Sequence, residues 1–153
     1  MKPSAFVREY YPRAKSICRA AGISTVGCLA QAALETGWGD HHPGGVWFGI
    51  KRWRQGQEAT AQPTYEVIDG QRVNVEAGFV ANATFEDAVR GYCDFIRSNP
   101  RYKAALLHPD DWRAYVAAVA RAGYATDPEY LDKLLSIGAV IEREVYLQGL
   151  EVA

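Results

Sequence analysis

The chain has 153 residues, of which 48% are hydrophobic and 23% are charged, as in a globular protein large enough to bury its own core. Its formal net charge of −1 excludes the strongly basic field typical of proteins that bind nucleic acid or anionic membranes. No apolar run approaches the roughly 18 residues of a membrane-spanning helix. We therefore expect one domain over residues 1–153, with no nucleic acid partner and no membrane insertion, and we expect a monomer.

The N-terminal residues, Met1-Lys2-Pro3-Ser4-Ala5-Phe6, lack the apolar core of a signal peptide. The three cysteines, Cys18, Cys28 and Cys93, fall among apolar helical positions, and an odd number does not indicate a disulfide framework. We therefore expect buried free thiols and synthesis in the reducing cytoplasm. A target outside the cytoplasm would require a separate route of release.

Two helices are predicted in the first 36 residues. The first runs from about residue 4 to 20, and Gly22 ends it. The second follows Ser24, a plausible N-cap, and stops before Gly37, where the backbone must turn left-handed. Its apolar residues recur at three- and four-residue steps: Val26, Leu29, Ala30, Ala33 and Leu34.

The middle of the chain predicts a loop followed by a β-hairpin. Residues 37–56 lose periodicity and are rich in Gly, Trp and His, as in many functional loops. Two β-rich stretches follow at about 60–68 and 71–81. The Asp69-Gly70 pair between them is a strong signal for a two-residue turn.

Helices are predicted again from Thr84 to the C-terminus. Thr84 is the expected N-cap of a helix that Asn99-Pro100 stops, and Gly123 ends the next helix. Asp127 is the expected N-cap of the last helix, with a proline at the first helical position. The fold class is therefore α+β, a mostly helical body with one small β-hairpin lobe, and the cleft between the two is the natural place for a site.

Glu35 is the first candidate catalytic residue. It lies in the last turn of its helix, at the negative end of the helix dipole, where a carboxylate is unfavourable and its pKa should rise. A raised pKa lets a carboxyl group act as general acid near neutral pH. Position alone favours a solvated glutamate, and the neighbouring motifs change that assessment.

Glu66 is the second candidate, on the first strand of the hairpin in Thr64-Tyr65-Glu66-Val67. A helical body and a β lobe facing each other would bring Glu35 and Glu66 across one cleft. Two carboxylates flanking a glycosidic bond are the usual equipment of glycoside hydrolysis. Alone, a strand glutamate is more often solvent-facing, so the pairing is the sharper hypothesis.

Four motifs in order give the chain a family resemblance. They are Leu29 to Gly39, Phe48-Gly49-Ile50-Lys51, Asn99-Pro100-Arg101-Tyr102 and Gly123-Tyr124-Ala125-Thr126-Asp127-Pro128. The set closely resembles the β-N-acetylglucosaminidase family of peptidoglycan hydrolases, as in flagellar-type glucosaminidase domains. That resemblance implies a lysozyme-like fold and cleavage between N-acetylglucosamine and N-acetylmuramic acid. It also implies that Glu35 is the proton donor, Glu66 the second acid and Tyr124 a cleft tyrosine that positions sugar or water.

The second motif departs from the family pattern. The family usually reads Asn-Leu-Phe-Gly-Ile-Lys, whereas this chain has Val46 and Trp47 before Phe48. The change removes one polar side chain near the expected cleft. Trp47 would add an apolar face that stacks on a pyranose.

The loop between the second helix and the hairpin carries further candidates for binding. Sugar faces pack well on aromatic rings, which makes Trp38, Trp47, Phe48 and Trp53 candidates, with core packing as the rival reading and Trp47 and Trp53 expected to be the more exposed. Lys51, in the basic run Lys51-Arg52-Trp53-Arg54, is a candidate contact for wall-peptide carboxylates; the same run also suits nucleic acid or a solvated loop. Asp40-His41-His42 resembles a metal cluster, but adjacent residues rarely converge on one ion, so we expect no metal and no cofactor.

Three functions remain open at this point. The leading one is hydrolysis of the β-1,4 bond of peptidoglycan by carboxylate acid/base catalysis. The others are a lytic transglycosylase of lysozyme-like fold and a catalytically idle peptidoglycan-binding module. For the biological setting we expect a phage or prophage endolysin released through a membrane pore, or an effector secreted by a dedicated machine.

Overall fold

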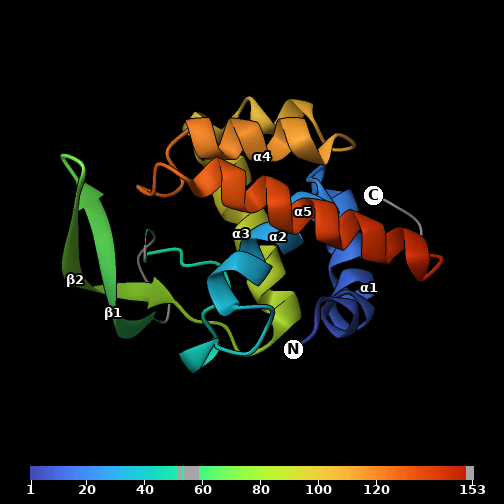
Figure 1. Ribbon diagram of the computed structural model, residues 1–153, viewed down its shortest axis with the longest axis horizontal. Coiled ribbons are helices and arrows are strands. Elements are labelled where there is room, and N and C mark those ends of the chain that lie inside the picture. Colours follow the sequence, from blue (N-terminus) through green and yellow to red (C-terminus); the bar gives the residue numbers. More distant parts are fainter. Residues whose placement is uncertain (52, 54–58, 151–153) are drawn as a thin grey trace.

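The computed structural model describes residues 1–51, 53 and 59–150, and for residues 59–66 and 72–77 it describes the backbone alone. The described part is α+β, as predicted: a helical body from whose side a two-stranded hairpin projects (Figure 1). The helices are α1 (Pro3–Ala21), α2 (Thr25–Thr36), α3 (Phe85–Ser98), α4 (Trp112–Arg121) and α5 (Tyr130–Leu147), and the strands are β1 (Ala59–Ile68) and β2 (Gln71–Val80). Three short 3₁₀ turns, η1 (Pro43–Gly45), η2 (Pro100–Tyr102) and η3 (Ala105–Leu107), connect them.

Helix α2 is the centre of the body, packed by α1, α4 and α5. Ten of its 12 residues are buried, because its sequence is apolar on nearly every face. Ser24 is its N-cap, as predicted, and accepts a hydrogen bond from the Gly27 amide at 3.1 Å. Gly37 follows its last residue with a φ of 57°, in the left-handed conformation that the sequence predicted.

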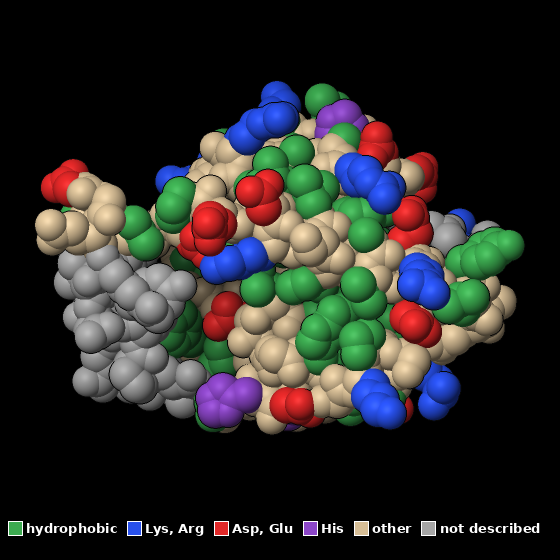
Figure 2. Space-filling view, in the orientation of Figure 1, with side chains coloured by type: hydrophobic (Ala, Val, Ile, Leu, Met, Phe, Trp, Pro, Cys, Tyr) green, Lys and Arg blue, Asp and Glu red, His purple; other side chains and the backbone are tan. Residues whose placement is uncertain are grey.

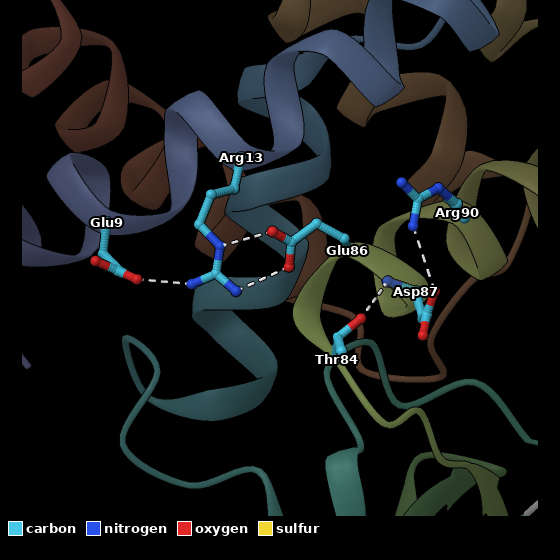
Figure 3. A network of polar contacts seen from close by, with 6 residues as sticks. All are labelled: Glu9, Arg13, Thr84, Glu86, Asp87 and Arg90. Carbon is cyan, nitrogen blue, oxygen red and sulfur yellow. Dashed lines mark hydrogen bonds and ion pairs between the residues drawn. The ribbon is translucent and has the colours of Figure 1, made fainter.

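Polar contacts join α1 to the start of α3 (Figure 3). The Arg13 guanidinium donates two hydrogen bonds to the Glu86 carboxylate, at 3.0 and 2.8 Å, and a third to Glu9 at 2.7 Å. Thr84 caps α3 as predicted, accepting from the Asp87 amide at 3.0 Å. The two-pronged Arg13–Glu86 pair fixes the orientation of α3 against α1.

The hairpin forms in the predicted register, with Ile68 opposite Gln71 across the turn. Asp69 and Gly70 both have positive φ, 51° and 76°, which is the geometry of a type I′ turn. Two backbone contacts attach the hairpin to the body. The Val80 amide donates to the Ile50 carbonyl at 2.6 Å, and the Val67 amide donates to the Thr126 hydroxyl at 2.9 Å.

The start of the last helix differs from the prediction. α5 begins at Tyr130, so Asp127 is not its N-cap. Asp127 instead accepts from the Glu129 amide at 2.8 Å and pairs with the Lys133 ammonium at 2.5 Å, which holds the turn before the helix. The predicted N-cap was wrong because a tight turn precedes the helix, and an aspartate that holds such a turn has the same sequence signature as a helix N-cap.

The remaining sequence predictions for the body concern cysteines and hydrophobic length. Cys18, Cys28 and Cys93 are free and buried, as predicted. Within the described residues, none of the helices combines the length and the apolar character needed to cross a membrane.

Candidate active site

A cleft of about 570 Å³ opens between the helical body and the base of the hairpin. The end of α2 contributes Glu35 to it, and the loop after η1 contributes Gly49, Ile50 and Lys51. Residues 123–127, which lead into α5, form the facing wall. The cleft therefore lies where the sequence predicted, between the body and the β lobe.

Glu35 occupies the wall of this cleft with a perturbed carboxyl group. Glu35 is an exposed residue of the cleft wall, yet the protein packed around its carboxyl group desolvates that group and raises its pKa to about 7. The direction of the shift is the one predicted from the helix end. Its main cause is desolvation rather than the helix dipole.

Gly49 makes the closest approach to Glu35. A Cβ placed on Gly49 would lie 2.7 Å from both the Cδ and Oε2 of Glu35 and 2.9 Å from its Oε1. Gly49 also has a φ of 62°, which side chains rarely adopt. A glycine at position 49 therefore lets the backbone approach the Glu35 carboxyl group this closely.

Tyr124 fixes the loop that carries Gly49. Its hydroxyl donates to the Phe48 carbonyl at 2.8 Å, directly before Gly49 in the chain. The Phe48 ring stacks on Tyr92, with centroids 4.4 Å apart. Burial raises the pKa of the Tyr124 hydroxyl, and the Glu35 charge raises it further, so the two groups are electrostatic neighbours.

A buried polar chain supports the same wall from inside. Gln31 lies one helical turn before Glu35 and is 2% exposed. Its amide nitrogen donates to the Tyr130 hydroxyl at 2.9 Å, and its amide oxygen accepts a short hydrogen bond from Tyr92. The Tyr92 hydroxyl in turn contacts that of Tyr115 at 2.5 Å. The Gln31 amide thus positions two tyrosines: Tyr130, which lines the cleft, and Tyr92, which lies behind its wall.

A row of aromatic rings lines the cleft beyond Tyr124. Phe95 lies between Trp53 and Tyr102, with centroids 5.4 and 5.5 Å away. Tyr102 lies 6.0 Å from Tyr124, and Tyr124 stacks parallel to Tyr130 at 6.0 Å. Such rings offer apolar faces to the C–H faces of sugars, so this wall suits an extended saccharide.

Asp127 also lines the described cleft, and its pKa is shifted in the opposite direction to that of Glu35. Lys133 donates a hydrogen bond to it and the Glu129 amide donates another, and these lower the Asp127 pKa. Asp127 is therefore held ionised while Glu35 keeps its proton near neutral pH. Carboxyl groups whose surroundings separate their pKa values in this way are typical of acid/base sites, although both Asp127 oxygens are occupied by structural partners.

Comparisons with known proteins agree with this geometry. Residues 11–142 match the family model for glucosaminidases, described as mannosyl-glycoprotein endo-beta-N-acetylglucosaminidase. The chain belongs to the glucosaminidase family. It is 38% identical to the peptidoglycan hydrolase FlgJ of Vibrio parahaemolyticus over 92% of this chain and 48% of that protein. It is 31% identical to the exo-glucosaminidase LytG of Bacillus subtilis over 75% of this chain and 42% of that protein.

Solved structures give the same result for the fold of this glucosaminidase. A peptidoglycan hydrolase mutant from Sphingomonas sp. A1 superposes with a TM-score of 0.83 at 30% identity, covering 94% of this chain and 99% of that one. The truncated glycoside hydrolase domain of Salmonella typhimurium FlgJ superposes with a TM-score of 0.73 at 29% identity, covering 93% and 99%. The chain spans about half the length of the curated relatives it matches. The chain has the lysozyme-like fold that the sequence predicted.

Three of the aromatic residues predicted to bind substrate do not line the cleft of this glucosaminidase. Trp47, expected to be exposed, is only 5% exposed, and packs against Tyr10 and Phe85. Trp38 packs edge-on against Phe6, and the Phe48 ring lies on Tyr92 in the core. The expected exposure of Trp47 was wrong, because the sequence of an irregular loop does not reveal which of its rings turn inward.

The structure also shows where Val46 lies, the residue that stands in place of the family's usual asparagine. Val46 is buried, and neither it nor Trp47 is among the residues that line the cleft. Trp47 is therefore not placed to stack on a pyranose in the described cleft. Lys51 and Trp53, by contrast, do line the cleft as predicted.

Other predicted residues lie partly or wholly outside the described part of the glucosaminidase. Glu66 is on β1, paired with Val73 on β2, but its side chain is outside the described residues. Arg52 and Arg54 of the basic run are outside them as well. His42 stacks on Trp47 at 4.3 Å, and among the described residues no three His, Cys, Asp or Glu side chains gather as a metal site.

Sequence reasoning missed four residues of the wall as candidates: Phe95, Arg101, Tyr102 and Tyr130. Arg101 and Tyr102 lay within a quoted motif, so the motif itself was the available signal. Phe95 and Tyr130 lie outside the quoted motifs, and the packing of α3 and α5 brings them to the cleft.

Proposed function

We propose that this glucosaminidase hydrolyses the β-1,4 bond between N-acetylglucosamine and N-acetylmuramic acid in peptidoglycan. The observation that carries the proposal is the Glu35 carboxyl group, with a pKa raised to about 7, on the wall of a saccharide-sized cleft. The family membership and the peptidoglycan hydrolases among the relatives support the choice of substrate.

Glu35 is the general acid in this proposal. A pKa of about 7 leaves much of the Glu35 population protonated at neutral pH, so it can donate a proton to the leaving oxygen of the glycosidic bond. The Gly49 backbone against its carboxyl group restrains the direction of that donation. Glycosidic bonds break through an oxocarbenium-like transition state, so protonation of the leaving oxygen removes much of the barrier.

The positive charge that builds on the sugar needs a second group. We assign Glu66 on β1 to this role, as base or charge-stabilising carboxylate, in keeping with its place on the β lobe. The acetamido group of the substrate is the alternative, acting as an internal nucleophile. Tyr124, beside Glu35, is the wall residue that orients sugar or water.

Digestion of purified peptidoglycan tests the proposal. Wild type, Glu35→Gln and Glu66→Gln are compared, with released fragments identified by mass spectrometry. We expect wild type to release fragments with reducing N-acetylglucosamine ends, and Glu35→Gln to lose at least about 100-fold in rate, the scale of general acid catalysis. A comparable loss in Glu66→Gln indicates the carboxylate route, and retained activity indicates the acetamido route.

The same products separate the competing functions. Anhydro sugar ends in place of reducing ends would identify a lytic transglycosylase. Binding to the wall by folded protein without any release of fragments would identify a binding module. Full activity in Glu35→Gln would remove Glu35 from the mechanism.

A further inference from the structure

Three cationic residues line the described cleft: Lys51, Arg101 and Lys133. The Lys133 ammonium is neutralised by Asp127, 2.5 Å away. For Arg101 no ion pair with an acidic residue is found in the described part of the chain. On the face in Figure 2, acidic and basic side chains are interspersed rather than gathered by sign. Arg101 is therefore a cation of the cleft wall that remains available to an acidic group of a ligand.

The local structure places Arg101 at the cleft on a short, well-defined turn. Asn99 ends α3 and its side chain accepts from the Arg101 amide at 3.4 Å, which starts η2. Within this turn Tyr102 is buried and Arg101 is exposed. The turn thus fixes the Tyr102 ring in the aromatic wall and leaves the Arg101 guanidinium at its edge.

The Arg101 guanidinium lies beside the 123–127 segment of the cleft wall. A Cβ at Gly123 would lie 4.0 Å from Arg101 Nη1, which is van der Waals contact. Arg101 also acts on the Tyr102 hydroxyl, whose pKa it lowers against the larger, raising effect of burial. Tyr102 is the ring next to Tyr124, which neighbours Glu35. Two rings of the wall, Tyr102 and Tyr124, therefore separate Arg101 from Glu35.

The chemistry of the proposed substrate supplies the counter-charge. An N-acetylglucosamine unit is neutral. The muramic acid unit carries a lactyl group whose carboxyl is charged when free; where a peptide is attached, this carboxyl forms the amide bond and the negative charge lies on the carboxylates of the peptide. A guanidinium is always charged and presents paired donors that match a carboxylate. Neutral sugar hydroxyls give no comparable reason for a cation at this point of the wall.

We propose that Arg101 binds a carboxylate on the muramic acid side of the glycan strand, and that this contact makes the cleft prefer carboxylate-bearing strands over neutral ones. The proposal rests on the peptidoglycan hydrolase function proposed above. On strands that bear peptide the carboxylate is one of the peptide's, and on strands without peptide it is the free lactyl carboxylate.

The test compares three substrates: solubilised peptidoglycan strands, the same strands with their carboxylates converted to amides, and strands stripped of peptide by an amidase. Wild type is compared with Arg101→Gln and with Lys103→Gln, an exposed cation two residues on that does not line the described cleft. Melting temperatures confirm folding, which an exposed side chain such as Arg101 should not disturb.

On intact strands we expect Arg101→Gln to lose about tenfold in kcat/KM, mainly through KM, the scale of one charge-assisted contact. Amidation should cost wild type about the same factor and cost Arg101→Gln nothing further, because the same contact is then lost only once. Lys103→Gln should behave as wild type. On stripped strands, a persisting effect of Arg101→Gln shows that the lactyl carboxylate freed by the amidase can take the place of the peptide carboxylate. Disappearance of the effect shows that only carboxylates of the peptide reach Arg101.

Equal losses on amidation in wild type and Arg101→Gln would overturn the proposal, as would an Arg101→Gln variant with unchanged kcat/KM on intact strands. Failure of the underlying function looks different, because wild type would then cleave none of the three substrates.

Discussion

At the scale of single residues, the site depends on a glycine packed against a glutamate. Glu35 needs a surrounding poor in water to keep its proton, and Gly49 supplies one side of it with backbone alone. Tyr124 holds that backbone through the Phe48 carbonyl. The position of the Glu35 carboxyl group thus depends on two other segments of the chain, the loop at Gly49 and the segment at Tyr124.

Replacing Gly49 tests this arrangement. In Gly49→Ala the new methyl group would overlap the Glu35 carboxyl, and we expect a loss of about 100-fold in kcat, the scale of a small misplacement of a catalytic group. Both activity and the free energy of unfolding are measured.

Gly70→Ala is the matched control. Gly70 has a similar positive φ, 76°, but nothing lies within 4 Å of its Cβ position. It should cost about 1–2 kcal/mol in stability from backbone strain alone and leave kcat close to wild type. Equal losses of activity in both variants would show that strain, not contact with Glu35, is responsible.

At the scale of elements, α2 carries both the acid and the residue that supports the wall. Gln31 and Glu35 are four positions apart, so they lie on the same face of the helix. Gln31 holds Tyr130 of α5 and Tyr92 of α3, and Tyr130 stacks on Tyr124. A buried helix can thereby transmit the packing of the body to the cleft.

Gln31→Leu should remove this support. It keeps a side chain of similar size but leaves the Tyr92 and Tyr130 hydroxyls without the amide, and unsatisfied buried polar groups cost about 1–3 kcal/mol. We expect a lower urea midpoint and a reduced kcat. Gln148→Leu, at the end of α5, is the control: its amide bonds the Ser4 carbonyl at 2.9 Å and does not line the described cleft. A Gln31→Leu protein with wild-type midpoint and kcat would contradict this account.

Short sequence patterns correctly predicted where several helices and the hairpin turn begin. The Ser24 and Thr84 caps and the Asp69-Gly70 turn depend on bonds between near neighbours in the chain, and the structure confirms all three. The cap assigned to Asp127 was wrong because the following turn uses the same local bond before the helix begins.

At the scale of the whole molecule, the cleft is a product of tertiary packing. Its wall draws Phe95 from α3, Tyr102 from η2 and Tyr130 from α5. Tyr102 lies in a quoted motif, but no motif marks Phe95 or Tyr130, and Trp47 has an ordinary loop pattern. Periodicity therefore could not separate wall from core. The family motifs placed Glu35 and Tyr124 correctly at the cleft, because motifs reflect the assembled site.

The raised pKa of Glu35 also has a consequence for stability. Its value of about 7 lies above the ordinary 4.5, so folding favours the protonated form. The stabilisation is complete below pH 4.5 and is lost as the pH rises through 7. Unfolding of wild type should therefore become easier over this range relative to Glu35→Gln, whose side chain does not titrate.

The most direct test of the account is the pH dependence of kcat/KM for wild-type hydrolysis of solubilised peptidoglycan. If Glu35 donates the proton, kcat/KM should fall above a pKa of about 7, by about tenfold per pH unit. A rate that stays level to pH 9, or that already falls near pH 4.5, would contradict the assignment of Glu35 as the protonated acid of this site.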